Sequence, residues 1–151
     1  MNLTEEPQIV TWPETHYAFL ERTGPFVPNA QLAWQDLYRI VPALAAKNQV
    51  TGFVSLYKMN PQIYRAGVSL AAPPVELPAG MQYERFVGGK YSRFVLTGSY
   101  SILPEATGRA WRIAAEKKIP LRDGFSIENY VNDPKTTPQE QLITEILFPA
   151  A

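Results

Sequence analysis

The sequence predicts an α+β fold built from two similar βαββ halves in tandem. Two observations lead to this prediction. The chain contains the same order of segments twice, namely a strand that ends in Thr-Gly, a helix, and a hairpin of two strands. Its 151 residues also suit one domain with a full core and are too few for two ordinary domains. We therefore expect a single domain over residues 1–151, with repeat one at about 6–73 and repeat two at about 80–150.

Each half opens with a segment of strand character. Residues 16–24 and residues 90–98 both alternate aromatic or β-branched residues with polar ones and end in Thr-Gly. An aromatic residue, Phe26 or Tyr100, follows each Thr-Gly pair. This pattern predicts a strand and then a turn at the start of each half.

A helix is expected after each of these strands. The first helix is predicted to start near Asn29, a residue type that caps helices well, and to end or kink at Pro42. The second is predicted to start near Pro104, with Ser101 as its cap, and to stop before Pro120. Trp34 and Trp111 are expected to anchor the helices to the sheet. The alternative is a helix tilted over the mouth of a cleft, which would expose the edge of one indole.

A strand hairpin is expected after each helix. The arms are predicted at residues 52–61 and 64–70 in the first half, and at 125–134 and 142–148 in the second. A proline-rich connector, residues 71–80, separates the halves.

The expected assembly follows from the elements. Because a helix covers only one face of a three-stranded sheet, two such halves placed edge to edge should give an antiparallel sheet with both helices on one face. We expect a ligand cleft on the other face, at the junction of the halves.

Composition excludes several kinds of function. The 14 basic and 14 acidic residues cancel, so no direct binding of nucleic acid is expected. No apolar run is long enough to span a bilayer, and the acidic start does not resemble a signal peptide, so we expect a cytoplasmic protein without membrane attachment. With no cysteine and a single histidine, His16, neither a metal site nor a cofactor is expected.

Several segments carry a resemblance to a known family. They are Glu6–Val10, Tyr64–Val68, Gly88–Tyr91, Glu128–Pro134 and Thr137–Ile146. In this order they resemble the GyrI-like small-molecule-binding family, which includes effector domains of multidrug-responsive and AraC-type transcription activators and free-standing gyrase-inhibitor-like proteins. The resemblance implies a central hydrophobic cleft with a carboxylate, here Glu128, that attracts lipophilic cations. A transcription-factor role for this chain alone is not expected, and Asn129 stands where the family is usually aliphatic.

Strand alternation gives a separate reason to consider Glu128. Side chains alternate across a strand, so Glu128 and Tyr130 share one face while Ile127 and Asn129 share the other. We expect the more aliphatic set to pack against the helix, which would turn Glu128 and Tyr130 towards the cleft. A carboxylate that is partly dehydrated there should have a raised pKa and favour a cationic guest.

Eight residues are predicted to line the ligand site. They are Glu128, Tyr130, Tyr57, Phe53, Tyr91, Tyr100, Phe26 and Trp111. The alternative interpretation is structural, with the tyrosines as cross-strand stabilisers and Glu128 as an exposed residue paired with a lysine.

Several functions remain open at this point. The main hypothesis is a stand-alone protein that binds small lipophilic compounds, including cationic ones. The alternative is an enzyme that hydrolyses strained electrophilic toxins, in which Glu128 would activate water and Tyr130 would act as an acid. A protein partner, DNA gyrase or a separate regulator, is a further alternative from the resemblance. Tetrapyrrole binding is a fourth, for which His16 is poorly placed.

Overall fold

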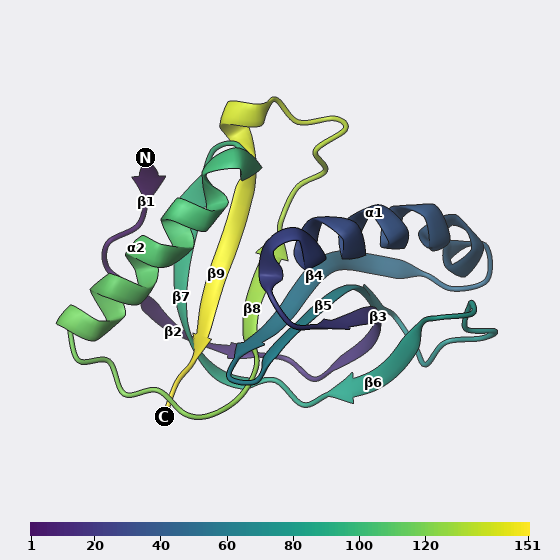
Figure 1. The fold of residues 1–151 in the computed structure, drawn as a ribbon, viewed down its shortest axis with the longest axis horizontal. Helices are drawn as coiled ribbons and strands as arrows, with labels where there is room; N and C mark the ends of the chain where they lie inside the picture. Colours follow the sequence, from purple (N-terminus) through teal and green to yellow (C-terminus); the bar gives the residue numbers. More distant parts are fainter. The chain divides into compact units, whose positions relative to one another are not determined.

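The structure, a computed structural model, describes residues 1–151 and contains nine strands, two α-helices and two 3-10 helices (Figure 1). The elements run in the order β1 (Asn2–Leu3), β2 (Gln8–Trp12), β3 (Thr15–Thr23), α1 (Phe26–Ala45), β4 (Val50–Met59), β5 (Gln62–Leu70), β6 (Gln82–Phe86), β7 (Gly89–Thr97), η1 (Tyr100–Ile102), α2 (Leu103–Glu116), β8 (Ser126–Tyr130), η2 (Gln139–Gln141) and β9 (Ile143–Pro149). The predicted α+β class and the order of strand, helix and hairpin in each half are confirmed.

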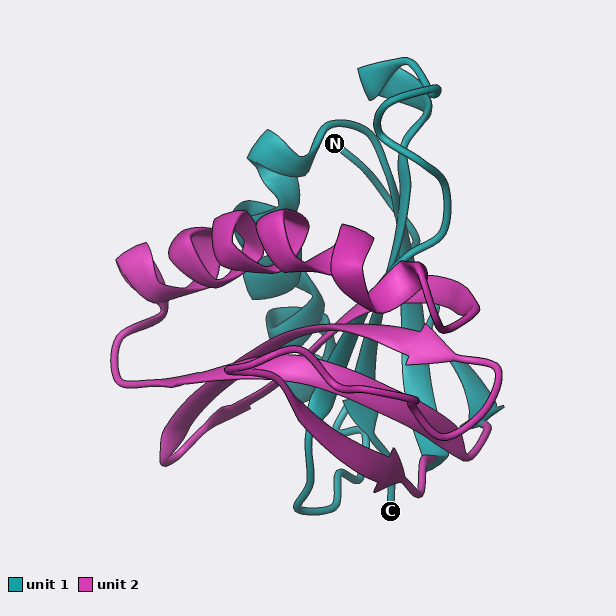
Figure 2. Cartoon of the chain, turned by 90° about the vertical axis from the view of Figure 1, so that its right-hand side faces the viewer, with its two compact units in different colours: residues 1–12, 89–151 teal, residues 13–88 magenta.

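The chain forms two compact units (Figure 2). Unit 2 is residues 13–88, and its antiparallel strands lie in the order β4-β5-β3-β6. Unit 1 combines residues 1–12 with residues 89–151. Its antiparallel strands lie in the order β8-β9-β7, and both β1 and β2 pair with the other edge of β7.

Two edge strands do not pair with the strand that follows them in the sequence. Strand β2 comes just before β3 in the sequence but pairs with β7, and β6 comes just before β7 but pairs with β3. Neither strand is among those predicted from the sequence. Each is only five residues long, and a short alternating run is also compatible with a loop.

Helix α1 begins close to the predicted position and ends later than predicted. Val27 has non-helical dihedrals, φ −103° and ψ 119°, so regular turns begin only beyond it, near Asn29. The Asn29 amide donates to the carbonyls of Thr23 and Pro25, which fixes the entry of the chain into the helix. The helix does not end at Pro42 but continues to Ala45. A proline so near the end removes only one N–H bond that the helix would otherwise make.

Helix α2 matches the predicted range of its half. Pro104 lies in its first turn, where the missing N–H costs nothing, and the helix ends at Glu116, before Pro120. The preceding 3-10 turn is capped by Ser99, whose hydroxyl accepts from the backbone N–H of Ser101 at 3.2 Å. Helix α2 itself follows Ile102 and has no side-chain cap, so the prediction that Ser101 caps it is wrong.

In each unit the helix packs on one face of the antiparallel sheet. Buried residues of α1 contact the unit 2 sheet, and buried alanines of α2 contact the unit 1 sheet. The helix residues are Ala33, Leu37 and Leu44 in α1 and Ala106, Ala110 and Ala114 in α2. We call these two surfaces the helix-bearing faces. None of the helices is both long and apolar enough to cross a membrane.

The opposite faces carry matching buried tyrosines. The Tyr17 hydroxyl donates to the carbonyl of Val54 at 2.8 Å in unit 2, and the Tyr91 hydroxyl donates to the carbonyl of Phe125 at 2.9 Å in unit 1. Burial raises the pKa of both phenols. Both phenol groups are therefore uncharged at pH 7, and the rings are fixed parts of the sheets.

Candidate ligand-binding site

Glu128 lies on the helix-bearing face of unit 1. Its carboxylate accepts a hydrogen bond from the Tyr130 hydroxyl at 2.9 Å and a long one from the Thr107 hydroxyl of α2 at 3.4 Å. Tyr130 packs against the apolar cluster beneath α2, whereas Ile127 is buried on the other side of the strand. The predicted alternation is right, but the prediction that Ile127 and Asn129 face the helix is wrong.

Strand β4 of the first half has the same arrangement. Ser55 lies under α1, because its hydroxyl accepts from the Trp34 indole N–H at 3.2 Å, and Phe53 and Tyr57 pack in the cluster beneath that helix. Val54 therefore faces away from α1. Both faces of β4 are largely buried, so hydrophobicity alone did not identify the face that meets the helix.

The environment of Glu128 disfavours its charged form. The residue is half-buried, and burial raises the pKa of the carboxyl above its ordinary value, while the hydrogen bonds from Tyr130 and Thr107 act in the opposite direction. No lysine, arginine or histidine forms an ion pair with it. The interpretation of Glu128 as an exposed glutamate paired with a lysine is therefore wrong.

Four of the predicted aromatic residues form two equivalent ring pairs. In unit 1 the rings of Tyr100 and Tyr130 meet edge to face with centroids 5.5 Å apart. In unit 2 Phe26 and Tyr57 meet in the same way at 5.8 Å. The aromatic residue two positions after each Thr-Gly pair thus contacts the strand tyrosine of its own half. In unit 1 this pair adjoins the carboxylate, because the Tyr130 hydroxyl bonds Glu128.

The remaining predicted residues are distributed differently. Phe53 belongs to a cluster with Trp34 and Tyr38 on the helix-bearing face of unit 2. Trp111 stacks on Phe148 at 3.7 Å, as expected of an anchor between helix and sheet. Tyr91 lies on the opposite face of unit 1, so the structure does not bring it together with Glu128.

Thr107 is the site residue that the sequence analysis does not include. A threonine in an amphipathic helix gives no signal by itself. Thr107 precedes Glu128 by the same 21 positions by which Trp34 precedes Ser55, and the second pair is also hydrogen-bonded across helix and strand. This repeat spacing is the signal in the sequence that could have identified it.

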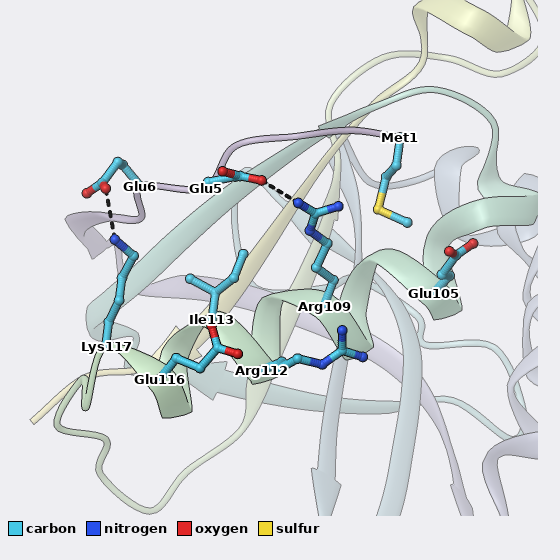
Figure 3. A pocket seen from close by; sticks show the side chains of 9 residues that line it. All are labelled: Met1, Glu5, Glu6, Glu105, Arg109, Arg112, Ile113, Glu116 and Lys117. Carbon is cyan, nitrogen blue, oxygen red and sulfur yellow. Dashed lines mark hydrogen bonds and ion pairs between the residues drawn. The ribbon is translucent and has the colours of Figure 1, made fainter.

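A separate hollow of about 660 Å³ lies on the outer side of α2 (Figure 3). Arg109 of the helix and Lys117, just beyond its end, reach across to Glu5 and Glu6 of the N-terminal segment and form ion pairs with them. Its lining is mainly charged residues of both signs, and Glu128 is not part of it. It therefore does not have the aromatic character expected of a site for lipophilic guests.

The histidine and the acidic residues do not assemble a metal centre. His16 bonds the Tyr83 hydroxyl through Nδ1 at 2.7 Å at the edge of unit 2. No group of three or more histidine, aspartate or glutamate side chains is arranged to hold a metal ion.

Comparison with known families and structures identifies the class of this domain. The chain belongs to the GyrI-like small molecule binding domain family, whose profile matches residues 5–151. The predicted family resemblance is thereby confirmed. None of the curated proteins matches the chain.

Solved structures share the fold at low sequence identity. The C-terminal domain of EcmrR is similar with a TM-score of 0.77 and 14% identity, over 97% of this chain and 97% of that one. SAV2435, in a structure with bound tetraphenylphosphonium, has a TM-score of 0.75 and 16% identity, over 97% of this chain and 94% of that one. A hydrolase from Listeria innocua has a TM-score of 0.63 and 13% identity, over 98% of this chain and 93% of that one.

Proposed function

We propose that this GyrI-like domain binds small lipophilic organic cations, and that Glu128 is the residue that attracts the charge. The observation that carries the proposal is the state of this carboxylate. It is half-buried, has a pKa raised by burial, and forms no ion pair with the protein. A cation placed beside it would supply the missing counter-charge.

The adjoining rings support a lipophilic guest. The edge-to-face pair of Tyr100 and Tyr130 lies next to the carboxylate. Aromatic faces attract cations by about 0.5–2 kcal/mol for a well-placed ring. The ligand of the SAV2435 structure, tetraphenylphosphonium, is a cation of this chemical class. Charge and ring contacts together favour lipophilic cations over neutral or anionic compounds.

Titration with tetraphenylphosphonium tests the proposal. We expect saturable binding by isothermal calorimetry, weakened at least about tenfold in Glu128→Gln, since about 1.4 kcal/mol corresponds to tenfold in affinity. Glu105→Gln is the matched control, because Glu105 lies in the charged hollow on the outer side of α2. Equal binding by wild type and Glu128→Gln would show that the carboxylate is not the cation site. Loss of binding in Glu105→Gln instead would place the cation site in the charged hollow.

A second candidate function is hydrolysis of electrophilic compounds. The observation that favours it is the 2.9 Å hydrogen bond between the Tyr130 hydroxyl and Glu128. A carboxylate with a raised pKa is suited to take a proton from water, and a neighbouring tyrosine is suited to donate one. Mass spectrometry of an epoxide or cyclopropane probe after incubation distinguishes the functions. Turnover that is lost in both Glu128→Gln and Tyr130→Phe supports hydrolysis, and an unchanged probe supports binding alone.

A further inference from the structure

The two halves of the chain provide an internal comparison for the surroundings of Glu128. The same offset of 73 residues relates the helix residues and the hairpin tyrosine of unit 2 to those of unit 1. It superimposes buried Ala33 on buried Ala106, and Tyr57 on Tyr130. At this offset the corresponding pairs around Glu128 are Trp34 with Thr107, Tyr38 with Trp111, Phe53 with Ser126, and Ser55 with Glu128.

In unit 2 the residue equivalent to Glu128 is Ser55, and the protein's own Trp34 indole bonds it. The Trp34 N–H donates to the Ser55 hydroxyl at 3.2 Å and to the Tyr64 hydroxyl at 2.8 Å, and these two hydroxyls lie 2.8 Å apart. The indole ring is surrounded by Tyr38 and Phe53, with centroids at 5.7 and 6.3 Å. An aromatic ring with an N–H donor thus completes the helix-bearing face of this half.

In unit 1 two of the corresponding positions carry smaller side chains. Thr107 replaces the tryptophan and reaches Glu128 only at 3.4 Å, which is long for a hydroxyl donor, and Ser126 replaces the phenylalanine. This half therefore presents a carboxylate and a threonine where the other half presents a serine and an indole.

We propose that the guest of Glu128 is a flat aromatic molecule with an N–H donor, which takes in unit 1 the place that the Trp34 indole has in unit 2. This inference rests on the proposed function and narrows it from lipophilic cations in general to protonated N-heteroaromatic cations. Such a guest would donate its N–H to the Glu128 oxygen that Thr107 bonds only weakly. Its ring would lie beside Thr107, where the other half has the Trp34 side chain.

A donor N–H adds more than charge alone. A hydrogen bond between a cationic N–H and a carboxylate is shorter and stronger than a neutral one. A quaternary cation of equal size keeps the charge but cannot make this bond, so its attraction to Glu128 is only that of a nearby charge. The geometry of unit 2 thus predicts a preference between two cations that differ only in this N–H.

The acridine orange cation and its 10-methyl derivative form a matched pair for the test. Both are flat fluorescent cations of similar size, but only acridine orange, protonated at its ring nitrogen at neutral pH, has an N–H donor. We expect acridine orange to bind at least about tenfold more tightly by fluorescence anisotropy, as a hydrogen bond to a charged group implies. The ratio of the two dissociation constants should fall in Glu128→Gln, because the charge that strengthens the bond is gone.

A second variant tests the place of the ring. Thr107→Trp puts an indole in unit 1 at the position of Trp34 in unit 2, and we expect it to abolish dye binding by filling the site. Arg112→Trp puts the same indole on the outer side of the helix, in the charged hollow, and should still bind acridine orange. Thermal unfolding followed by circular dichroism checks that both variants fold. If Thr107→Trp does not fold, the ratio of the two dissociation constants measured with the wild type still tests the inference.

The outcomes separate the inference from the proposed function. If both dyes bind equally well and both depend on Glu128, a cation site exists but the N–H donor has no role, and the inference is overturned. Unchanged binding by a folded Thr107→Trp variant also overturns it. If neither the dyes nor tetraphenylphosphonium bind, the proposed function fails as well.

Discussion

At the scale of single residues, Glu128 has the most unusual environment in the described site. Several carboxylates on the strands and helices of this chain pair with arginine, as Glu145 does with Arg93 at 3.1 Å. Glu128 instead has two neutral hydroxyl partners, and burial is the largest influence on its pKa. In such a position the protonated form of a carboxyl is favoured over the ionised form more strongly than it is in water.

This environment predicts how stability depends on pH. Because the folded-state pKa is raised above the ordinary value of 4.5, ionisation of Glu128 opposes folding. Its cost is absent below pH 4.5 and develops as pH rises from there through the raised pKa. We expect Glu128→Gln to raise the free energy of unfolding relative to wild type above this range, by on the order of 1 kcal/mol, and to have little effect below it.

Urea unfolding between pH 4 and 8 provides the measurement. The difference between variant and wild type should increase with pH and then level off. Glu105→Gln, an exposed substitution on α2, should give a constant difference across the same range. A flat profile for Glu128→Gln would mean that burial does not perturb this carboxyl.

At the scale of elements, one glycine lies in a crowded place and another lies in an open one. A Cβ on Gly67 of β5 would lie 2.6 Å from both the Ala18 carbonyl oxygen and the Tyr17 ring, closer than real contacts allow. The strand passes beneath the buried Tyr17 ring, and only glycine fits there. Gly108 of α2 has open space around the same position.

These two glycines should respond to alanine with opposite signs. Gly67→Ala is expected to destabilise the protein by about 1–3 kcal/mol, because Tyr17 or the β3 backbone has to move. Gly108→Ala is expected to stabilise it by about 0.4–1 kcal/mol, because alanine favours the helix and meets no atoms. Chemical denaturation of both variants checks the signs. Destabilisation by Gly108→Ala would show that α2 is packed more tightly at that point than the structure describes.

At the scale of the whole molecule, the chain order and the strand pairing do not coincide. Strand β2 and the short β1 cover the edge of β7, and Glu5 and Glu6 between them form ion pairs with Arg109 and Lys117 of α2. Unit 1 is thus assembled from both ends of the chain. An uncovered strand of nine residues would present a row of free backbone groups.

Removal of residues 1–12 should therefore weaken unit 1 selectively. We expect the amides of β7 that pair with β2 to lose protection in hydrogen exchange, and the shortened protein to associate through the exposed edge. The amides of β3 provide an internal control, because β6 still covers that edge. Retained protection along β7 would contradict the assigned pairing of β2.

The sequence by itself determined the family, the α+β class and the order of elements in the two halves, because these follow from local patterns. Thr-Gly turns, proline positions and alternating side chains are readable within about ten residues. Only the tertiary structure decided which face of each sheet the helix covers. Both faces of β4 are largely buried, and β8 has only five residues, one of them Asn129, so the pattern gave no direction.

The pairing of the edge strands β2 and β6 and the partners of Glu128 were likewise decided by long-range contacts. Pairing of β2 with β7 joins residues about 80 positions apart, and no local signal favours it over pairing with β3. Thr107 meets Glu128 only because α2 lies on that face of its sheet. Local sequence specifies which elements form, whereas the burial of whole faces specifies which of them come together.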